Sequence, residues 1–199
     1  MQHCASVLLF QYFYIRAVGE KKHQQRRKLI MRPILKYFSE DGEAPVIDFT
    51  WGTVQPFMTS FSRGVKWESP QKNEVTFFQK NVTIRACPCI HHPYFILVFT
   101  GFNSYEHEKN FAVVVDYEGT LVKRLELQPA ISELSLNHKN EIKVSRFSNA
   151  SWEAINGQTV VCVTIDMVVH IGWLNIWEKR IFDEENLALD CLVDAWKEP

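Results

Sequence analysis

Short apolar runs separated by polar turns dominate the chain between residues 46 and 172. Many of these runs alternate apolar and polar positions and are rich in Val, Ile, Thr, Phe and Trp, which favours strands. The 3.6-residue period of helices is absent from this region. The pattern predicts strands at 46–54, 64–68, 74–78, 81–86, 94–102, 111–117, 120–127, 141–146 and 159–169. We therefore expect a mainly β fold, an antiparallel β-sandwich.

Two turn signals support this reading. Asp116-Tyr-Glu-Gly119 lies between two apolar runs. Its aspartate is suited to bond its own backbone, and its glycine supplies a positive φ. Asn156-Gly157 is a second pair of residues that tolerates the left-handed region. The first signal predicts a hairpin, and the second predicts a tight turn that precedes the strand at 159–169.

The residues before the sandwich follow another pattern. Apolar stretches at 5–15 and 34–38 flank a basic segment at 21–32, and we expect two short helical segments around it. Pro33 fits the first turn of the second segment, where its missing N–H is not needed. A polar cluster at 39–45, with both Gly and Pro, marks a boundary. The expected organisation is therefore an N-terminal helical and basic extension at 1–44, followed by the β-sandwich at 45–172.

Residues 173–199 form the third expected part. Four large apolar side chains recur there at helical spacing: Leu189, Leu192, Val193 and Trp196. This spacing predicts a C-terminal amphipathic helix over 183–197, with Asp183 suited to cap its first turn. The helix is acidic and the segment at 21–32 is basic, so we expect the two ends of the chain to pack within one molecule. A monomer is therefore favoured.

Charge and hydropathy narrow the range of partners. The chain has 199 residues with 22 basic and 23 acidic side chains, a formal net charge of -1. This balance excludes the uniform positive field that drives non-specific nucleic-acid binding, and no nucleic-acid partner is expected. A membrane span needs about 20 apolar residues, and Arg16 ends the first apolar run too early. No membrane partner is expected either.

The cysteines bear on the compartment. There are five of them, an odd number without disulfide-framework spacing, which favours reduced thiols and an intracellular location, cytoplasmic or nuclear. The alternative is a cleaved secretory signal within the apolar stretch at 5–15. Two glycosylation sequons, at Asn81 and Asn149, would suit that alternative.

The densest group of chemically versatile side chains is Cys87-Pro-Cys89-Ile-His91-His92. Thiols and imidazoles are preferred zinc ligands, but structural zinc normally takes its ligands from two separated knuckles. We expect buried cysteines and two histidines in the following turn, with a metal site at Cys87, Cys89, His91 and His92 as the alternative. The chain has no nucleophile elbow and no phosphate-binding glycine loop. Neither catalytic residues nor a cofactor are expected.

Three motifs carry a family resemblance. Phe49-Thr-Trp51 and Gly64-Val-Lys-Trp67 resemble the opening of a MATH domain, the TRAF-type β-sandwich, and Trp152 is similar to a late tryptophan of that family. Nematode proteins that join this sandwich to a BTB domain are the nearest in pattern, although no BTB domain is expected in this chain. The resemblance implies structural roles for Trp51, Gly64, Trp67 and Trp152.

The resemblance also implies a function. MATH domains are non-enzymatic interaction modules that capture an extended peptide of a partner protein along an exposed sheet edge. In such strand addition, main-chain hydrogen bonds supply affinity and side-chain pockets supply specificity. A role in substrate recognition by a ubiquitin-ligase adaptor follows from the same resemblance. The alternative is a β-sandwich that binds a small ligand or a metal, a degenerate hydrolase that uses the cluster at 87–92.

Overall fold

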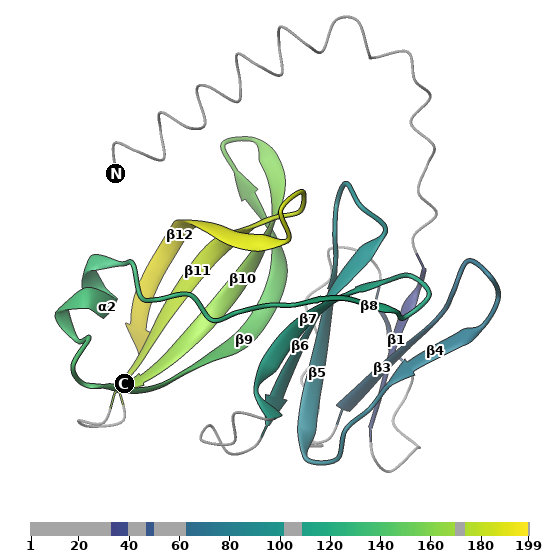
Figure 1. The fold of residues 1–199 in the computed structure, drawn as a ribbon, viewed down its shortest axis with the longest axis horizontal. Coiled ribbons are helices and arrows are strands. Elements are labelled where there is room, and N and C mark those ends of the chain that lie inside the picture. Colours follow the sequence, from purple (N-terminus) through teal and green to yellow (C-terminus); the bar gives the residue numbers. More distant parts are fainter. Residues whose placement is uncertain (1–32, 40–46, 50–62, 102–108, 170–173, 199) are drawn as a thin grey trace, which may run out of the picture. The chain divides into compact units, whose positions relative to one another are not determined.

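The computed structural model describes residues 33–39, 47–49, 63–101, 109–169 and 174–198. All of them fall within Arg32–Pro199, one of the two units into which the chain divides. In this described part the fold is mainly β and has two sheets (Figure 1). The expected helical segment and basic run before residue 33, and Trp51, lie outside the described residues.

The larger sheet, sheet A, has the order β2-β1-β3-β5-β6-β7-β8, with β4 paired to β3. Its strands are β1 (Leu35–Ser39), β2 (Ile47–Phe49), β3 (Arg63–Glu68), β4 (Glu74–Phe77), β5 (Val82–Pro88), β6 (Tyr94–Gly101), β7 (Phe111–Asp116) and β8 (Leu121–Arg124). Their pairings are antiparallel except between β3 and β5, which are parallel and share a single residue pair.

The smaller sheet, sheet B, is an antiparallel meander in the order β12-β11-β10-β9. Its strands are β9 (Ile142–Ile155), β10 (Gln158–Val169), β11 (Asn175–Asp183) and β12 (Ala188–Glu198). A short helix, α2 (Glu133–Asn137), lies between β8 and β9 along the chain. Ser132 caps this helix, because its side chain accepts a hydrogen bond from the amide of Ser135.

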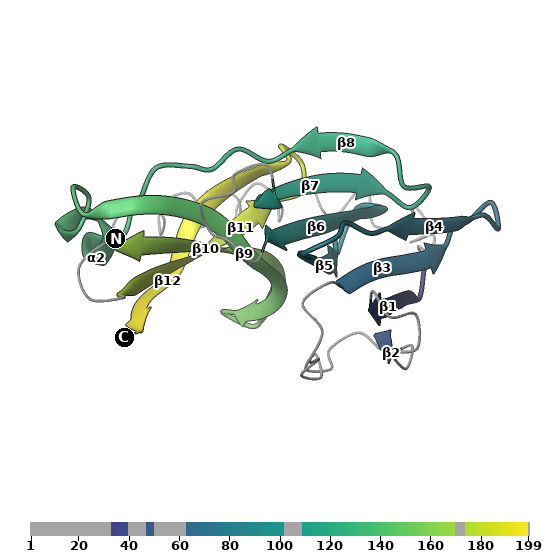
Figure 2. The same cartoon turned by 90° about the horizontal axis from the view of Figure 1, so that it is seen from below.

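The middle strands β6 and β7 are buried on both faces, and β5 lies beside β6 in the sheet (Figure 2). One face contributes Ile96, Val98 and Val114 to a first core, which these strands share with sheet B. The other face contributes Leu97 and Val113 to a second core, which is completed by β1 and β3. Successive side chains of a strand point to opposite faces, so a strand between two cores is apolar at every position. This accounts for the unbroken apolar runs in β6 and β7.

Trp67 is central to the second core and is 1 % exposed. Its indole Nε1 donates a 2.7 Å hydrogen bond to the carbonyl of Tyr117, and its ring packs against Phe95. A Cβ at Gly64, earlier on the same strand, would lie 2.2 Å from Cζ of Phe38. The tryptophan therefore fills the core, and the glycine admits an aromatic ring of β1 close to the backbone of β3.

Both predicted turns are confirmed. In the hairpin of β7 and β8, Oδ1 of Asp116 accepts hydrogen bonds from the amides two and four residues further on, at 3.0 and 2.8 Å. Gly119 has the expected positive φ of 83°. Between β9 and β10, Asn156 and Gly157 are both left-handed, with φ of 51° and 78°. Local turn chemistry therefore specified these two connections.

The amphipathic helix expected over 183–197 is wrong, because these residues form the turn after β11 and the edge strand β12. The apolar residues of β12 have a helical spacing because the register between β11 and β12 is irregular. Leu192 pairs with Arg180 and Leu189 pairs with Phe182, so three residue steps of β12 match two steps of β11. Apolar residues three apart thereby reach one sheet face and imitate a helical period.

The helical segment expected at 34–38 is also wrong. Leu35–Ser39 is a strand, β1, between β2 and β3. Leu35 and Tyr37 are buried in the second core, whereas Lys36 between them is exposed. Alternate burial against β3 decided the structure here, because sheet pairing overrides weak local preference.

Candidate functional site

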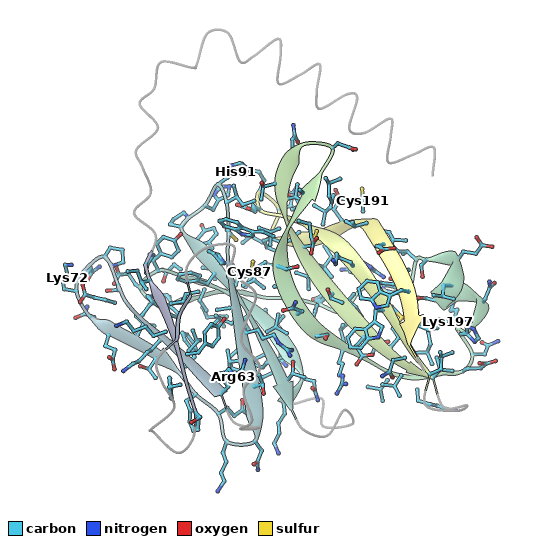
Figure 3. All side chains as sticks on the ribbon, turned by 180° about the vertical axis from the view of Figure 1, so that it is seen from behind. Arg63, Lys72, Cys87, His91, Cys191 and Lys197 are labelled. Carbon is cyan, nitrogen blue, oxygen red and sulfur yellow. The ribbon has the colours of Figure 1, made fainter. Side chains whose placement is uncertain are left out.

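The cluster of cysteines and histidines is split between the core and the surface (Figure 3). Cys87 and Cys89 belong to the first core, whereas His91 is exposed in the loop after β5. Burial raises the pKa of the Cys87 thiol well above its ordinary value, and the nearby Cys89 adds to the rise. The raised pKa favours the protonated thiol, which is the less nucleophilic form. Within the described residues, no group of three or more His, Cys, Asp or Glu side chains could hold a metal ion.

The histidine loop is instead bonded to sheet B. Glu184, in the turn between β11 and β12, accepts hydrogen bonds from the amides of Ile90 and His91 at 2.7 and 2.8 Å. Nε2 of His92 lies 3.3 Å from the carboxylate of Glu185. The loop at 89–93 therefore serves as a contact between the two sheets.

Trp152, on β9, makes a further contact between the sheets. Its side chain packs against the first core, and its Nε1 donates a 2.7 Å hydrogen bond to the carbonyl of Pro88. Arg85 of β5 donates a 2.6 Å hydrogen bond to the carbonyl of Ser148, where β9 and β10 lose register. The free edge of β9 is therefore partly covered by sheet A.

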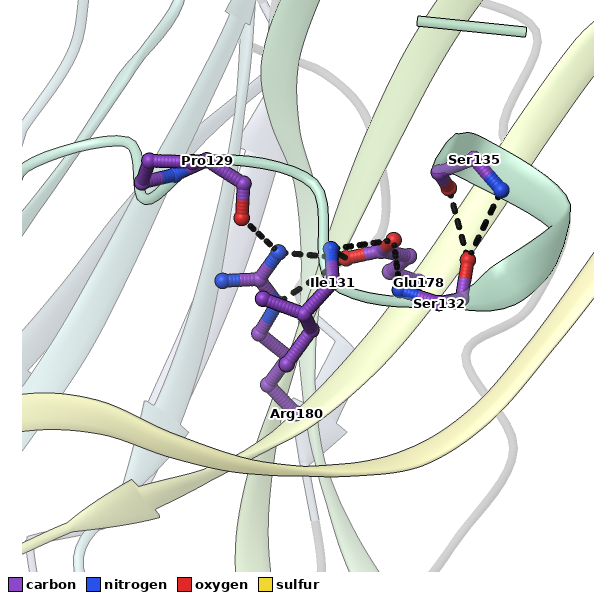
Figure 4. A network of polar contacts seen from close by, with 6 residues as sticks. All are labelled: Pro129, Ile131, Ser132, Ser135, Glu178 and Arg180. Carbon is purple, nitrogen blue, oxygen red and sulfur yellow. Dashed lines mark hydrogen bonds and ion pairs between the residues drawn. The ribbon is translucent and has the colours of Figure 1, made fainter. Parts of the chain in front are cut away.

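A buried ion pair holds the segment that leads from β8 to α2, which we call the crossing segment (residues 125–132). Glu178 and Arg180 are neighbours on one face of β11, 0 % and 2 % exposed, and their side chains are ion-paired. Glu178 accepts hydrogen bonds from the amides of Ile131 and Ser132 at 3.1 and 2.9 Å. Arg180 also donates to the carbonyl of residue 129 (Figure 4). The pair thus fixes the crossing segment on sheet B.

This network is electrostatically balanced. Burial alone would raise the pKa of Glu178, but hydrogen bonds from Ser135, Arg180 and Ser132 outweigh it and lower the pKa. The carboxylate is therefore charged at neutral pH, and its charge is met by the guanidinium and by backbone amides. We assign the pair a structural role, since its polar atoms are occupied in positioning the chain.

Beyond these contacts, β8 forms an edge of sheet A. It pairs with β7, with Arg124 opposite Val113, and Figure 2 shows it at the margin beyond β7. The amide of Leu125 continues this pairing by donating to the carbonyl of Ala112 at 2.9 Å. Because backbone groups of an antiparallel strand alternate in direction, the amide and carbonyl of Arg124 point away from β7. These groups are placed to pair with an additional strand.

Exposed apolar side chains gather on β8 and on the segments after it. The described residues include seven exposed large apolar side chains, and five of these lie between positions 121 and 136: Leu121, Val122, Leu127, Ile131 and Leu136. Leu121 is 62 % exposed. Leu121 and Val122 are neighbours on the edge strand itself, whereas Leu136 belongs to α2. In Figure 1 the chain carrying these residues runs from β8 past sheet B to α2.

A cavity of about 120 Å³ lies beside this edge. It is lined by Lys123, Leu125, Glu126, Gln128, Leu187, Ala188 and Leu189. One wall therefore comes from β8 and the crossing segment, and the other from the turn between β11 and β12. The ammonium of Lys123 lies 3.3 Å from the carbonyl of Asn186 and links the two walls. The space is partly open to solvent, its lining mixes polar and apolar side chains, and its volume is enough for one side chain.

Leu187 gives the far wall an uncommon backbone. Its φ is 50°, in the left-handed region that costs a residue with a Cβ roughly 1–2 kcal/mol. The side chain packs against the first core as it lines the cavity. Lys72, Asn81 and Asn156 have the same left-handed backbone in other strand connections, so this conformation belongs to the turn between β11 and β12.

The outer face of sheet B is a second polar surface. One row crosses all four strands: Arg146, Asp166, Trp177 and Trp196. The Arg146 guanidinium lies 2.7 Å from the buried carboxylate of Asp166, and the two indoles stack with centroids 6.2 Å apart. Lys179 pairs with Glu153 at 2.8 Å. Since these groups bond to one another, this face is a weaker candidate for binding than the β8 edge.

The strand predicted at 120–127 contains β8, but the sequence pattern did not show that β8 is an edge, and it missed the buried pair. A signal for the pair exists in β11, where Ile176, Glu178, Arg180 and Phe182 alternate with half-buried residues. Two opposite charges flanked by apolar residues on one strand face indicate a buried ion pair. The exposure of Leu121 has no local signal, because it depends on which strands lie beside β8.

Comparisons with known proteins give no relative: no family model, no curated protein and no solved structure matches the chain. Within the described residues, no helix has the length and apolar character that a membrane crossing requires. The features that bear on function are therefore the edge strand, the exposed side chains and the cavity.

Proposed function

We propose that this protein is a non-catalytic interaction module that binds an extended peptide segment of a partner protein by strand addition to β8. The observation that carries the proposal is the group of exposed apolar side chains on and after an edge strand. The outward backbone groups of Arg124 would supply main-chain hydrogen bonds. Strand addition gains its affinity from such bonds and its specificity from pockets for alternate side chains.

The two edge strands of sheet B support this role less well. The edge of β9 is partly used by the hydrogen bond from Arg85 to Ser148. On β12, Asp190 and Asp194 are exposed, whereas the apolar Leu192 is half-buried. Both β12 and β8 carry exposed charges, and β8 differs by its exposed apolar side chains Leu121 and Val122. The edge at β8 combines exposed apolar side chains with a neighbouring cavity.

A strand added to β8 would meet a different environment on each face. Lys123 and Leu125 lie on the face that leads to the cavity. Leu121 pairs with Val115 of the second core and lies on the opposite face. Alternate side chains of a bound peptide would therefore enter the cavity or cover Leu121. Covering Leu121 would stabilise the complex by about 25 cal/mol for each Å² of apolar surface that is removed from water.

The tryptophan motifs that resemble MATH domains favour the same mode of binding. A role in recognising substrates for ubiquitination follows from that resemblance alone and remains a prediction. The described residues give the alternative metal site at Cys87, Cys89, His91 and His92 no support, because no group able to hold a metal forms among them.

Selection of peptides from a displayed random library on the purified full chain tests the proposal. We expect enriched peptides to slow hydrogen exchange at the amide of Arg124, since that amide would acquire an acceptor. N-methylation of alternate peptide residues should abolish binding in one register and spare it in the other, because only every second amide faces β8.

Matched variants locate the site. Leu121→Lys should weaken binding because it places a charge where the peptide covers an apolar side chain. Ile34→Lys is the control, since Ile34 is 61 % exposed, like Leu121 at 62 %, but precedes β1. Enrichment of no peptide, or binding that leaves the exchange of Arg124 unchanged, would overturn the proposal.

A further inference from the structure

The charges of β8 are both positive, and neither has a carboxylate partner among the described residues. Lys123 and Arg124 form no ion pair with any of the described residues. The Lys123 ammonium lies near a backbone carbonyl, and the Arg124 guanidinium lies 4.8 Å from the ring centre of Phe111. Both side chains are exposed. The strand edge therefore presents two cations whose charge nothing described compensates by direct contact.

The two cations lie on opposite faces of the strand. Lys123 lines the cavity with Leu125, whereas Arg124, the residue between them, points to the other face. Residues directly opposite each other on paired strands interact, and opposite charges there stabilise the pairing. A bound strand would thus gain from a carboxylate opposite each of these two residues. Glu126, also at the cavity, is the acidic neighbour further along the crossing segment.

We infer that the partner of β8 is an acidic peptide in which a large aliphatic residue adjoins two carboxylate residues, with the aliphatic side chain in the cavity beside Leu125. The inference rests on the proposed strand addition and adds the chemistry of the bound segment. Antiparallel addition places the carboxylates directly after the aliphatic residue, and parallel addition places them directly before it. The order in the bound peptide therefore also reports the strand direction.

The cavity defines the size of the aliphatic residue. Its volume of about 120 Å³ lies between Leu125 and the turn residues Leu187 and Leu189. Ala188 lines the same space, so a larger side chain at this position would occupy it. Ala188→Phe should reduce the affinity for peptides with leucine or isoleucine at the anchor and affect glycine-anchored peptides less. Ala154→Phe, at an exposed position of β9, is the matched control.

The decisive experiment repeats the random-peptide selection on the wild-type chain and on the double variant Lys123→Glu, Arg124→Glu. We expect aliphatic-acidic peptides from the wild type, at least about a tenfold loss of their affinity for the double variant, and basic peptides from selection on that variant. Lys139→Glu, which changes an exposed charge beyond α2, should leave the affinity unchanged. Circular dichroism and urea unfolding verify that each variant is folded.

A milder pair of changes guards against misfolding. Lys123→Gln with Arg124→Gln removes charge without reversing it, and rising salt should weaken wild-type binding more than binding by this variant. Enriched peptides that protect Arg124 but show no acidic preference would overturn the inference and leave the proposed strand addition standing. Enrichment of no peptide at all would overturn both.

Discussion

Glu178 is a charged residue that the fold buries completely. Removing a carboxylate from water costs several kcal/mol, and the attraction of a buried partner offsets that cost only with good geometry. Here Arg180 and the amides of Ile131 and Ser132 supply the compensation. Both charges are satisfied when the crossing segment lies in its observed place. The pair therefore selects one path for the chain rather than adding much net stability.

Glu178→Gln tests this role at the scale of a single residue. We expect the free energy of unfolding at neutral pH, measured with urea, to fall by about 3–5 kcal/mol because the Arg180 charge stays buried without a partner. Glu68→Gln, in an exposed ion pair with Lys72 at 2.8 Å, should change it by less than about 1 kcal/mol. Equal losses in the two variants would contradict the assignment.

We also expect the contribution of Glu178 to the free energy of unfolding to depend on pH. The pKa of Glu178 is lower in the folded protein than in the unfolded chain. Glu178 therefore contributes fully to the free energy of unfolding at pH values above its pKa in the unfolded chain, about 4.3 for glutamate. This contribution is lost as the pH falls through the lower pKa that Glu178 has in the folded protein. The difference in unfolding free energy between wild type and Glu178→Gln should be constant near neutral pH and shrink below about pH 4. A difference that persists in acid would argue against a charged Glu178.

At the scale of elements, the two confirmed turns depend on glycine for different reasons. Gly157 has a φ of 78°, and no atom lies within 4 Å of the position a Cβ would take. Gly119 has a φ of 83°, and a Cβ there would meet Cγ1 of Val75 at 2.5 Å. The turn before β10 requires only the backbone conformation. The turn before β8 also requires the absence of a side chain.

Alanine substitution separates these two requirements. Gly157→Ala should destabilise the fold by about 1–2 kcal/mol, the cost of a left-handed residue with a Cβ. Gly119→Ala should cost more, because Val75 must also move. Urea unfolding of both variants measures the difference, and an equal loss would mean that the contact with Val75 relaxes freely.

At the scale of the whole described unit, the middle strands join two cores. Ile96 and Leu97 are adjacent on β6, both 0 % exposed, and belong to different cores. Each core has a tryptophan whose indole N–H donates a hydrogen bond, Trp152 to Pro88 in the first and Trp67 to Tyr117 in the second. Since β6 forms a wall of both cores, a loss of packing in one core destabilises β6 and therefore the other core as well. We expect the two cores to unfold together.

Ile96→Ala and Leu97→Ala test this coupling. Each should lower the free energy of unfolding by about 2–5 kcal/mol, because each leaves a cavity in a closed core. Hydrogen exchange of the indole N–H groups, followed by NMR, should accelerate at both Trp67 and Trp152 in both variants. Acceleration confined to the tryptophan of the altered core would show that the two cores open independently.

The sequence by itself determined the mainly β class, most strands between residues 63 and 169, and the two tight turns. These features are local. A run of alternating or unbroken apolar residues favours an extended backbone. The turns depend on a few residues that adopt a left-handed backbone or bond to nearby amides: Asp116, Gly119, Asn156 and Gly157. The burial of Cys87 and Cys89 also followed from local chemistry, because unpaired cysteines behave as small apolar side chains.

Only the tertiary structure decided the strand identity of β1 and β12, the path of the crossing segment and the candidate site. The spacing of Leu189, Leu192 and Trp196 fits a helix and an irregular strand equally well, and the register with β11 selects the strand. Leu121 is exposed because β8 is an edge, and the cavity exists because the turn after β11 lies opposite Leu125. Edge position, register and facing walls depend on residues distant in sequence, which a local pattern does not encode.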